Sequence, residues 1–237
     1  MYRIYFLKQN ICISNKIWYD AFTLFFTLKT MSFLTNLNWR YATKKFDTTK
    51  TISDGDLEKI IEAIRLTPTS FGLQPYHFYI VTNQIIKDKI QEASWNQPQV
   101  GTSSHLIVFV ARTDSKENID EYFQLMSNNN REVRDQLKWF EDMVTGFCTK
   151  KSSEEYLNWV SKQVYIASGF ALAACTELEI DSCAMEGFDP QATGNILGVP
   201  ENEKVLMMLP IGYRAEWEAP RGPKIRFSKE KLFTFIG

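Results

Sequence analysis

Apolar residues recur at helical spacing in several stretches of this chain. Between residues 54 and 66 they mark one helix face, Ser53 with Asp56 resembles a capping box, and Pro68 ends the pattern, so we predict an amphipathic helix there. Residues 153–178 carry the longest stripe, which turns to Ala and Cys near its end and predicts a central buried helix. The same reasoning predicts a helix at 85–94, two helices within 116–147 broken near 128–130, and a helix at 190–197 between the cap Asp189 and Gly198.

Other apolar runs have the length and composition of strands. Residues 76–82 are aromatic and β-branched, and residues 105–111 form a nearly continuous apolar run that suits a strand buried on both faces. Residues 204–213 and the short run 181–185 are predicted as further strands, and the tail 226–237 as an extended arm. Strands interspersed with helices, without regular βαβ alternation, predict an α+β sandwich.

The first thirty residues differ from the rest. Their apolar run, from Ala21 to Leu28, is too short to span a membrane, and Asp20 interrupts the core that a secretory signal needs. We interpret residues 1–30 as an N-terminal extension that is not native or is poorly ordered, with a short amphipathic helix packed on the domain as the alternative. Residues 31–237 contain no repeat, low-complexity tract or linker and are interpreted as one domain.

Composition narrows the class of protein without giving a function. The chain has 237 residues, 44% of them hydrophobic and 23% charged, which is ordinary for a soluble globular protein. Its net charge of −1 gives it no overall attraction to nucleic acid or to an anionic membrane. The four cysteines have no C-x-x-C spacing, so neither a zinc site nor a disulfide framework is expected, and sparse cysteine fits a reducing cytoplasm.

Two basic pairs stand far apart in the sequence. Arg40 and Lys44 are four residues apart and would share one face if their segment were helical. Lys224 and Arg226 flank Ile225, and in an extended arm they would point to the same side. Such pairs can hold a phosphate, with Arg as a bidentate fork and Lys as a point charge. Taken alone, each pair is better explained as a solvated basic surface.

Two further segments have features of a ligand site. Residues 67–78 join a helix end to a strand and offer the hydroxyls of Thr69 and Ser70, which can hold a ribityl chain or a phosphate together with backbone amides. An ordinary helix–strand loop is the alternative. Gly187 follows an apolar run and would let the backbone approach a flat ring, although a plain turn before the next helix is the alternative.

These segments together resemble the FMN-dependent nitroreductase family. Residues 67–78, which read TPTSFGLQPYHF, are similar to the family motif S-P-S-S-x-N-x-Q-P-W-H-F. Residues 162–165, KQVY, resemble its central-helix pattern, and residues 185–189, MEGFD, resemble its E-G-F-D pattern. The likeness runs from about Asn38 to the C-terminus, and it is specific to the family rather than to one substrate.

The resemblance implies a nitroreductase-like α/β sandwich, with a mainly antiparallel sheet flanked by helices, assembled as an intertwined homodimer with two FMN sites at its interface. Both basic pairs would hold the FMN phosphate and neighbouring polar atoms, and the hydroxyl loop would line the site from the partner subunit. The amides of Glu186 and Gly187 would lie near the reactive ring nitrogen. The FMN-binding positions implied in this way are Arg40, Tyr41, Ala42, Lys44, Thr69, Ser70, Gly72, Asn96, Gln163, Met185, Glu186, Gly187, Lys224 and Arg226.

The same resemblance implies an oxidoreductase with ping-pong kinetics. FMN would take a hydride from NADH or NADPH and pass it to a nitroaromatic, quinone or similar small acceptor, so no catalytic side chain and no metal are required. The sequence offers no paired carboxylates, Ser–His–Asp motif or metal-binding cluster, and His77 and His105, in or beside strands, are interpreted as structural. Alternatives are a narrower flavin reductase (dihydropteridine, enone or dehalogenation chemistry), a non-catalytic FMN-binding module, and an interaction protein without FMN.

Three positions depart from the family pattern. Gly72 stands where the family has Asn, Tyr41 where it often has His or Arg, and Gln99 where it often has Lys. These positions concern the ring edge and the substrate side, so the preferred acceptor is left open. The choice between NADH and NADPH is open as well.

Overall fold

The computed structural model describes residues 32–220 and 222–237, which fall into two compact units. The first unit ends at Trp39 and has one described helix, α2 (Ser32–Trp39), while the second spans Arg40–Gly237. Our interpretation of residues 1–30 lies outside the described residues. Across the described part of the chain, no helix has both the length and the apolar character needed to cross a membrane.

The second unit is built on an antiparallel sheet of four strands in the order β1-β2-β4-β3. They are β1 (Tyr76–Val81), β2 (His105–Arg112), β3 (Asp181–Ser182) and β4 (Glu203–Gly212), and every pairing is antiparallel. The predicted run at 105–111 is indeed buried on both faces. The predicted strand at 181–185 is shorter than expected, because the regular ladder ends at Ser182; beyond it, the amide of Cys183 still bonds Pro210, and Met185 pairs with Met208 in an isolated bridge.

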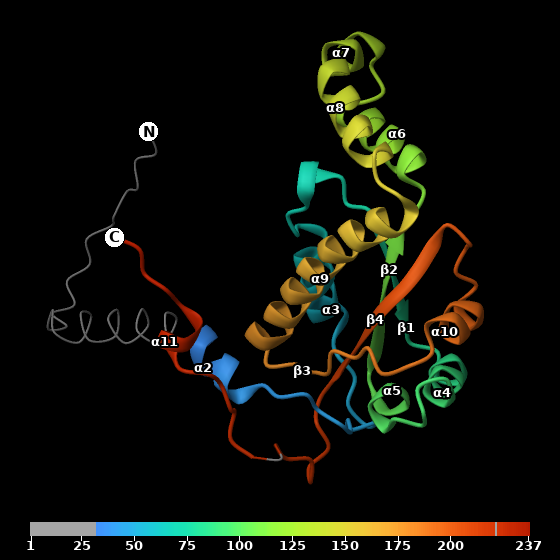
Figure 1. Ribbon diagram of the computed structural model, residues 1–237. Coiled ribbons are helices and arrows are strands. Elements are labelled where there is room, and N and C mark those ends of the chain that lie inside the picture. The colour runs from blue at the N-terminus through green and yellow to red at the C-terminus, as the bar shows by residue number, and fades with distance from the viewer. Residues whose placement is uncertain (1–31, 221) are drawn as a thin grey trace, which may run out of the picture. The chain divides into compact units, whose positions relative to one another are not determined.

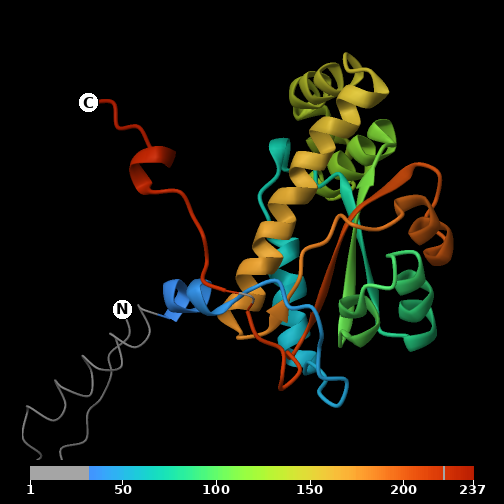
Figure 2. The same cartoon turned by 60° about the horizontal axis from the view of Figure 1, so that its bottom comes forward.

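Two groups of helices cover the two faces of this sheet (Figure 1 and Figure 2). On one face, Ile107 and Phe109 of β2 pack into a core with α3 (Asp54–Arg65) and α9 (Ser153–Glu177). On the other face, Leu106 and Val108 pack with α4 (Gln84–Glu92), α5 (Pro98–Thr102) and α10 (Pro190–Leu197). This alternation is the period-two pattern of a strand with two dry faces, and it confirms the α+β fold class.

A β-bulge in β4 changes which of the two cores its residues face. Phe109 pairs with Met207, but Val110 pairs with Val205, so Leu206 is the extra residue. Met207 therefore faces the α3–α9 core and Val205 the opposite one, although both have odd numbers. A bulge of one residue changes the face that the rest of the strand presents.

The segment 115–149 contains three helices, not the predicted two. They are α6 (Ser115–Met126), α7 (Arg131–Gln136) and α8 (Lys138–Thr149). The predicted break near 128–130 is present, with Asn128 and Asn129 at positive φ, and a second break falls at Leu137. Arg134 ties the three helices together through ion pairs with Asp120 and Glu141, at 2.7 Å each.

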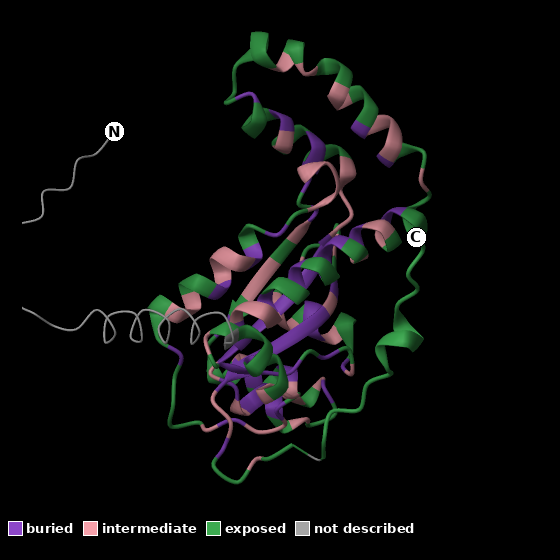
Figure 3. Cartoon of the chain, turned by 90° about the vertical axis from the view of Figure 1, so that its left-hand side faces the viewer, coloured by how far each residue is buried: buried purple, intermediate pink, exposed green. Residues whose placement is uncertain are grey.

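The C-terminal tail is less extended than predicted. Ser228 caps a short helix, α11 (Lys229–Leu232), by accepting a hydrogen bond from the amide of Lys231. Figure 3 shows the tail in the colour of exposed residues. Its large apolar side chains are all exposed: Ile225, Phe227, Leu232, Phe233, Phe235 and Ile236.

Candidate functional site

Three of the four residues of the basic pairs line one pocket of about 610 Å³, which Glu218 also lines. Lys44, Lys224 and Arg226 line it, together with Tyr41 and Ala42. The ammonium group of Lys224 donates a hydrogen bond to the carbonyl oxygen of Arg40, 184 positions away in the sequence. The convergence expected of these segments is therefore present in a single chain.

The segment that carries Arg40 and Lys44 is not helical, so the shared helix face that we considered is wrong. Ala42 instead pairs with Ser182, and Phe46 with Arg214, in isolated bridges beside the sheet. Because the backbone of this segment pairs with residues at the ends of strands, the sheet fixes its direction.

A buried ion pair anchors the same segment. Asp181 is 3% exposed and accepts hydrogen bonds from the side chain of Arg214 at 2.8 Å and from the hydroxyl of Thr43 at 3.1 Å. The guanidinium of Arg214 lies 4.5 Å from the ring centre of Tyr41. The pocket wall is thus held to the start of β3 and the end of β4.

The three cations that line the pocket outnumber its one described carboxylate, Glu218, so its electrostatics favour an anion. The pKa of Lys224 is lowered by burial and then by the charges of Arg40, Arg226 and Arg214, so its cation is disfavoured as the pocket stands. The Nε atom of Arg40 is buried and has no hydrogen-bond partner among the described residues. A ligand with phosphate oxygens would satisfy that donor and offset the repulsion among the cations.

The segment 185–187 lies beside this pocket and between two other elements. Lys44 Nζ is 3.4 Å from the Sγ atom of Cys183, two residues before Met185. On one side Tyr165 of α9 hydrogen-bonds the Glu186 carboxylate, and burial with that contact raises the pKa of Tyr165 to about 12. On the other side the Gln97 amide donates a hydrogen bond of 2.6 Å to the carbonyl oxygen of Gly187.

Gly187 is constrained to be small by an indole ring. A Cβ atom added there would lie 3.2 Å from a ring carbon of Trp95 and 3.4 Å from the Gln97 amide nitrogen. Trp95 and Asn96 both have positive φ, an uncommon conformation for such residues that the turn between α4 and α5 imposes. Within the part of the chain described, the amide groups of Glu186 and Gly187 donate no hydrogen bond, so both are available to a ligand.

The hydroxyl loop gathers at a different place. The amide of Ser70 donates a hydrogen bond of 2.9 Å to Gln163 of α9, and the hydroxyl of Thr69 accepts one of 3.1 Å from the amide of Gln74. Gln163 and Tyr165 are two residues apart on one helix, which turns them about 200° from each other. The hydroxyl loop and Glu186 therefore lie on opposite sides of α9, and one chain does not bring them together.

The departure at Gly72 has a local structural reason. Gly72 has φ +73, and a Cβ atom added there would lie 2.6 Å from the hydroxyl oxygen of Tyr122 in α6. The phenol of Tyr122 thus occupies the direction in which an asparagine side chain would leave the backbone.

Replacing Gly72 by Asn is expected to lower the free energy of unfolding by about 1–3 kcal/mol, because the new side chain overlaps the phenol of Tyr122. Asn tolerates a positive φ, so the steric contact accounts for most of the loss in stability. Urea unfolding measures the change in the free energy of unfolding. Adding Tyr122→Phe, which removes the nearest atom, should recover most of the loss; a double variant as unstable as G72N contradicts this explanation.

Several contacts were not foreseen from the sequence. Trp95, Gln97 and Tyr165 hold the Glu186–Gly187 segment, and Asp181 with Arg214 holds the segment of Arg40. Each contact joins positions far apart in sequence, so no local pattern signals it. The one local sign of such a contact is the position of the consecutive residues Trp95 and Asn96 between two short helices.

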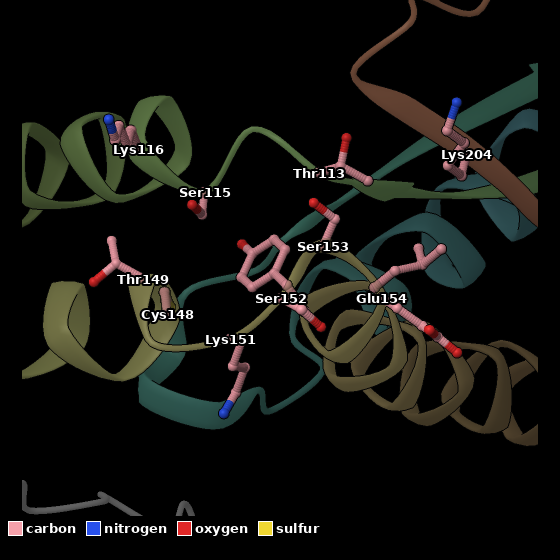
Figure 4. Close-up of a pocket in the computed structure, with 12 residues that line it drawn as sticks. Thr113, Ser115, Lys116, Cys148, Thr149, Lys151, Ser152, Ser153, Glu154 and Lys204 are labelled. Carbon is pink, nitrogen blue, oxygen red and sulfur yellow. The ribbon is translucent and has the colours of Figure 1, made fainter.

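A second pocket, of about 620 Å³, lies where α6, α8 and α9 approach each other. Lys116, Lys151 and Lys204 lie at its rim, but their ammonium groups point in different directions (Figure 4). The ammonium of Lys151 instead lies 3.8 Å from the ring centre of Phe147. Because the three cations do not converge, this pocket lacks the anion-binding arrangement found at Arg40 and Lys224.

Comparison with known proteins agrees with the resemblance seen in the sequence. The sequence model described as "Nitroreductase family" matches residues 37–213. A Staphylococcus saprophyticus protein with the provisional name NAD(P)H nitroreductase is 34% identical over 210 residues, which cover 84% of this chain and 94% of that protein.

Solved structures share the fold at lower identity. The structure of a Bacillus subtilis protein provisionally named a nitroreductase superposes with a TM-score of 0.76 at 21% identity, over 87% of this chain and all of that one. A structure from Exiguobacterium sibiricum, provisionally named a nitroreductase and solved in complex with FMN, has a TM-score of 0.73 at 19% identity, over 86% of this chain and 97% of that one.

Proposed function

Because the chain belongs to the nitroreductase family, we propose that it is an FMN-dependent oxidoreductase. It takes electrons from NADH or NADPH and reduces nitroaromatics, quinones or similar small acceptors. The observation that carries the proposal is the pocket lined by Lys44, Lys224 and Arg226. Beside it, Lys224 contacts Arg40, whose buried Nε atom has no hydrogen-bond partner among the described residues. A flavin phosphate has the charge and the oxygens that such a pocket lacks.

The residues of this chain bind and orient the cofactor. The four cations hold the phosphate end, and the unpartnered amides of Glu186 and Gly187 present donors to the polar edge of the ring. The carbonyl of Gly187 is fixed by Gln97, and the carboxylate of Glu186 by Tyr165, so these amides are held in place before a ligand arrives. FMN, when bound, supplies the hydride chemistry, and no side-chain base is needed.

We further propose a homodimer, because one chain leaves the site incomplete. Thr69, Ser70, Gly72 and Gln163 lie across α9 from Glu186, so they reach the flavin only from a second copy. The α9 surface between these groups is apolar and exposed at Ile166 and Phe170. An exposed apolar helix face and an exposed apolar tail are both surfaces that a second copy would cover.

Replacing Phe235 by Asp is expected to weaken self-association about 30-fold, since a large aromatic anchor is replaced by a charge. Phe235 is 94% exposed in the single chain, so the change does not disturb the core. Light scattering after size exclusion measures it. Thr234→Asp is the matched control, with the same charge one position away, and should stay dimeric; a wild-type protein that is monomeric yet retains FMN contradicts the two-chain site.

Steady-state kinetics test the proposed activity. With either nicotinamide as donor, double-reciprocal plots at several acceptor concentrations should be parallel. Parallel lines are expected because the donor and the acceptor bind at the same place one after the other. Turnover across nitroaromatics, quinones, enones and pteridines identifies the acceptor class. Bound FMN with no turnover of any acceptor would point to a binding module instead.

A further inference from the structure

Lys87 is a buried cation that forms no ion pair with a carboxylate in the described part of the chain. It lies in α4, is 4% exposed, and donates a hydrogen bond of 2.5 Å from Nζ to the carbonyl oxygen of Ser103. Among the described residues no carboxylate is within ion-pair distance of it, and burial lowers its pKa, opposed only by the charge of Asp88. An ammonium group is rarely buried without a counter-charge, because its desolvation is costly.

A second basic group is buried beside it. His105, the first residue of β2, is 6% exposed, and its Nδ1 lies 2.9 Å from the hydroxyl oxygen of Ser104. That hydroxyl also accepts a hydrogen bond of 3.0 Å from the amide of Ile52, which fixes its position. The pKa of His105 is lowered by burial and next by the charge of Lys87, with Asp54 opposing both. The charge of Lys87 therefore disfavours a proton on His105, and a small space lies beside both side chains.

That space is a pocket of about 250 Å³. Its buried part is formed by Lys87, Ser103 and His105, and hydroxyl groups of Thr48, Thr51 and Thr82 stand around its exposed part. Lys50 also lines it, and none of its lining residues is acidic. The volume is below the range of about 300–1,000 Å³ typical for drug-sized ligands, so it suits a small ion or one end group.

We propose that this pocket binds a small oxyanion, either free phosphate or the phosphate end of a small metabolite. The anion offsets the buried charge of Lys87, accepts hydrogen bonds from Lys87 Nζ and from the threonine hydroxyls, and lies beside the ring of His105. This site shares no lining residue with the pocket of Lys44, Lys224 and Arg226, so it is distinct from the proposed FMN site.

The chain has two histidines, which makes the test direct. In imidazole NMR spectra of the full-length protein with excess FMN, inorganic phosphate at constant pH and ionic strength should shift the His105 signals saturably, with a midpoint on the order of 1 mM. His77 is the internal reference, because its side chain is 52% exposed and pairs with Glu203. A parallel titration with glycerol phosphate distinguishes the sources: whichever compound saturates at the lower concentration is the preferred form.

Lys87→Met should raise that midpoint about tenfold or more, since a charge-assisted hydrogen bond is lost. Lys89→Met, an exposed position in the same helix, changes the net charge equally and should leave it unchanged. The titration of the unaltered protein decides the proposal even if Lys87→Met does not fold. His105 signals that stay fixed to about 20 mM phosphate, or that move only in parallel with those of His77, overturn it.

Discussion

Replacing Arg40 and Lys224 together by Ala is expected to weaken FMN binding about 100-fold or more, because two charge-assisted contacts to one phosphate are lost. The two residues are already in contact in the single chain, and the repulsion that lowers the pKa of Lys224 arises partly from Arg40. Fluorescence titration of the apoprotein with FMN measures the dissociation constant.

The matched control is Lys116→Ala with Lys204→Ala, which removes the same charge from the rim of the other large pocket. Its dissociation constant for FMN should stay within about twofold, because exposed charges far from the ligand are screened. Equal weakening in both double variants would mean that net charge alone attracts the cofactor. Unchanged binding in R40A/K224A would remove the phosphate assignment.

Asp181→Ala is expected to have the largest effect on stability. The substitution removes the buried carboxylate that accepts hydrogen bonds from Arg214 and from the hydroxyl of Thr43, so we expect a loss of about 3 kcal/mol in the free energy of unfolding. For a chain of this size that corresponds to a melting temperature lower by roughly 10 °C. Chemical unfolding followed by circular dichroism measures the change.

Asp142→Ala serves as its control, because Asp142 is 63% exposed and pairs with Lys138 four residues away on one helix. Removing that exposed pair should cost about 0.5 kcal/mol or less. An Asp181→Ala variant no less stable than Asp142→Ala would show that the pair of Asp181 and Arg214 does not hold the wall of the pocket lined by Lys44, Lys224 and Arg226.

Much of the fold is visible in the sequence because its elements are locally consistent. The continuous apolar run of β2 predicts a strand buried on both faces, and Asp189 and Gly198 mark both ends of α10. The bulge at Leu206 is not visible, because every neighbouring residue is apolar and gives no sign of which face it takes. The break at Leu137 is also missed, since Leu is compatible with a continuous helix.

The residues assigned to the candidate site stay a prediction, and the structure adds how the segments that carry them lie. Arg40 and Lys224 do converge, but through pairing to the sheet and not through a helix face. Gln97 contacts Gly187 across 90 positions, and Asp181 bonds Thr43 across 138, distances at which periodicity carries no information. Gly72 was visible as a departure, while its cause, the phenol of Tyr122, required the packing of α6 against the loop.

The most direct test of the central claim is an anaerobic visible spectrum of the purified protein, recorded before and after addition of NADH or NADPH. We expect a bound-flavin spectrum that bleaches on addition, and the nicotinamide that bleaches it at lower concentration is the preferred donor. A flavin spectrum that persists with both donors, or a colourless protein that FMN does not reconstitute, would contradict the account.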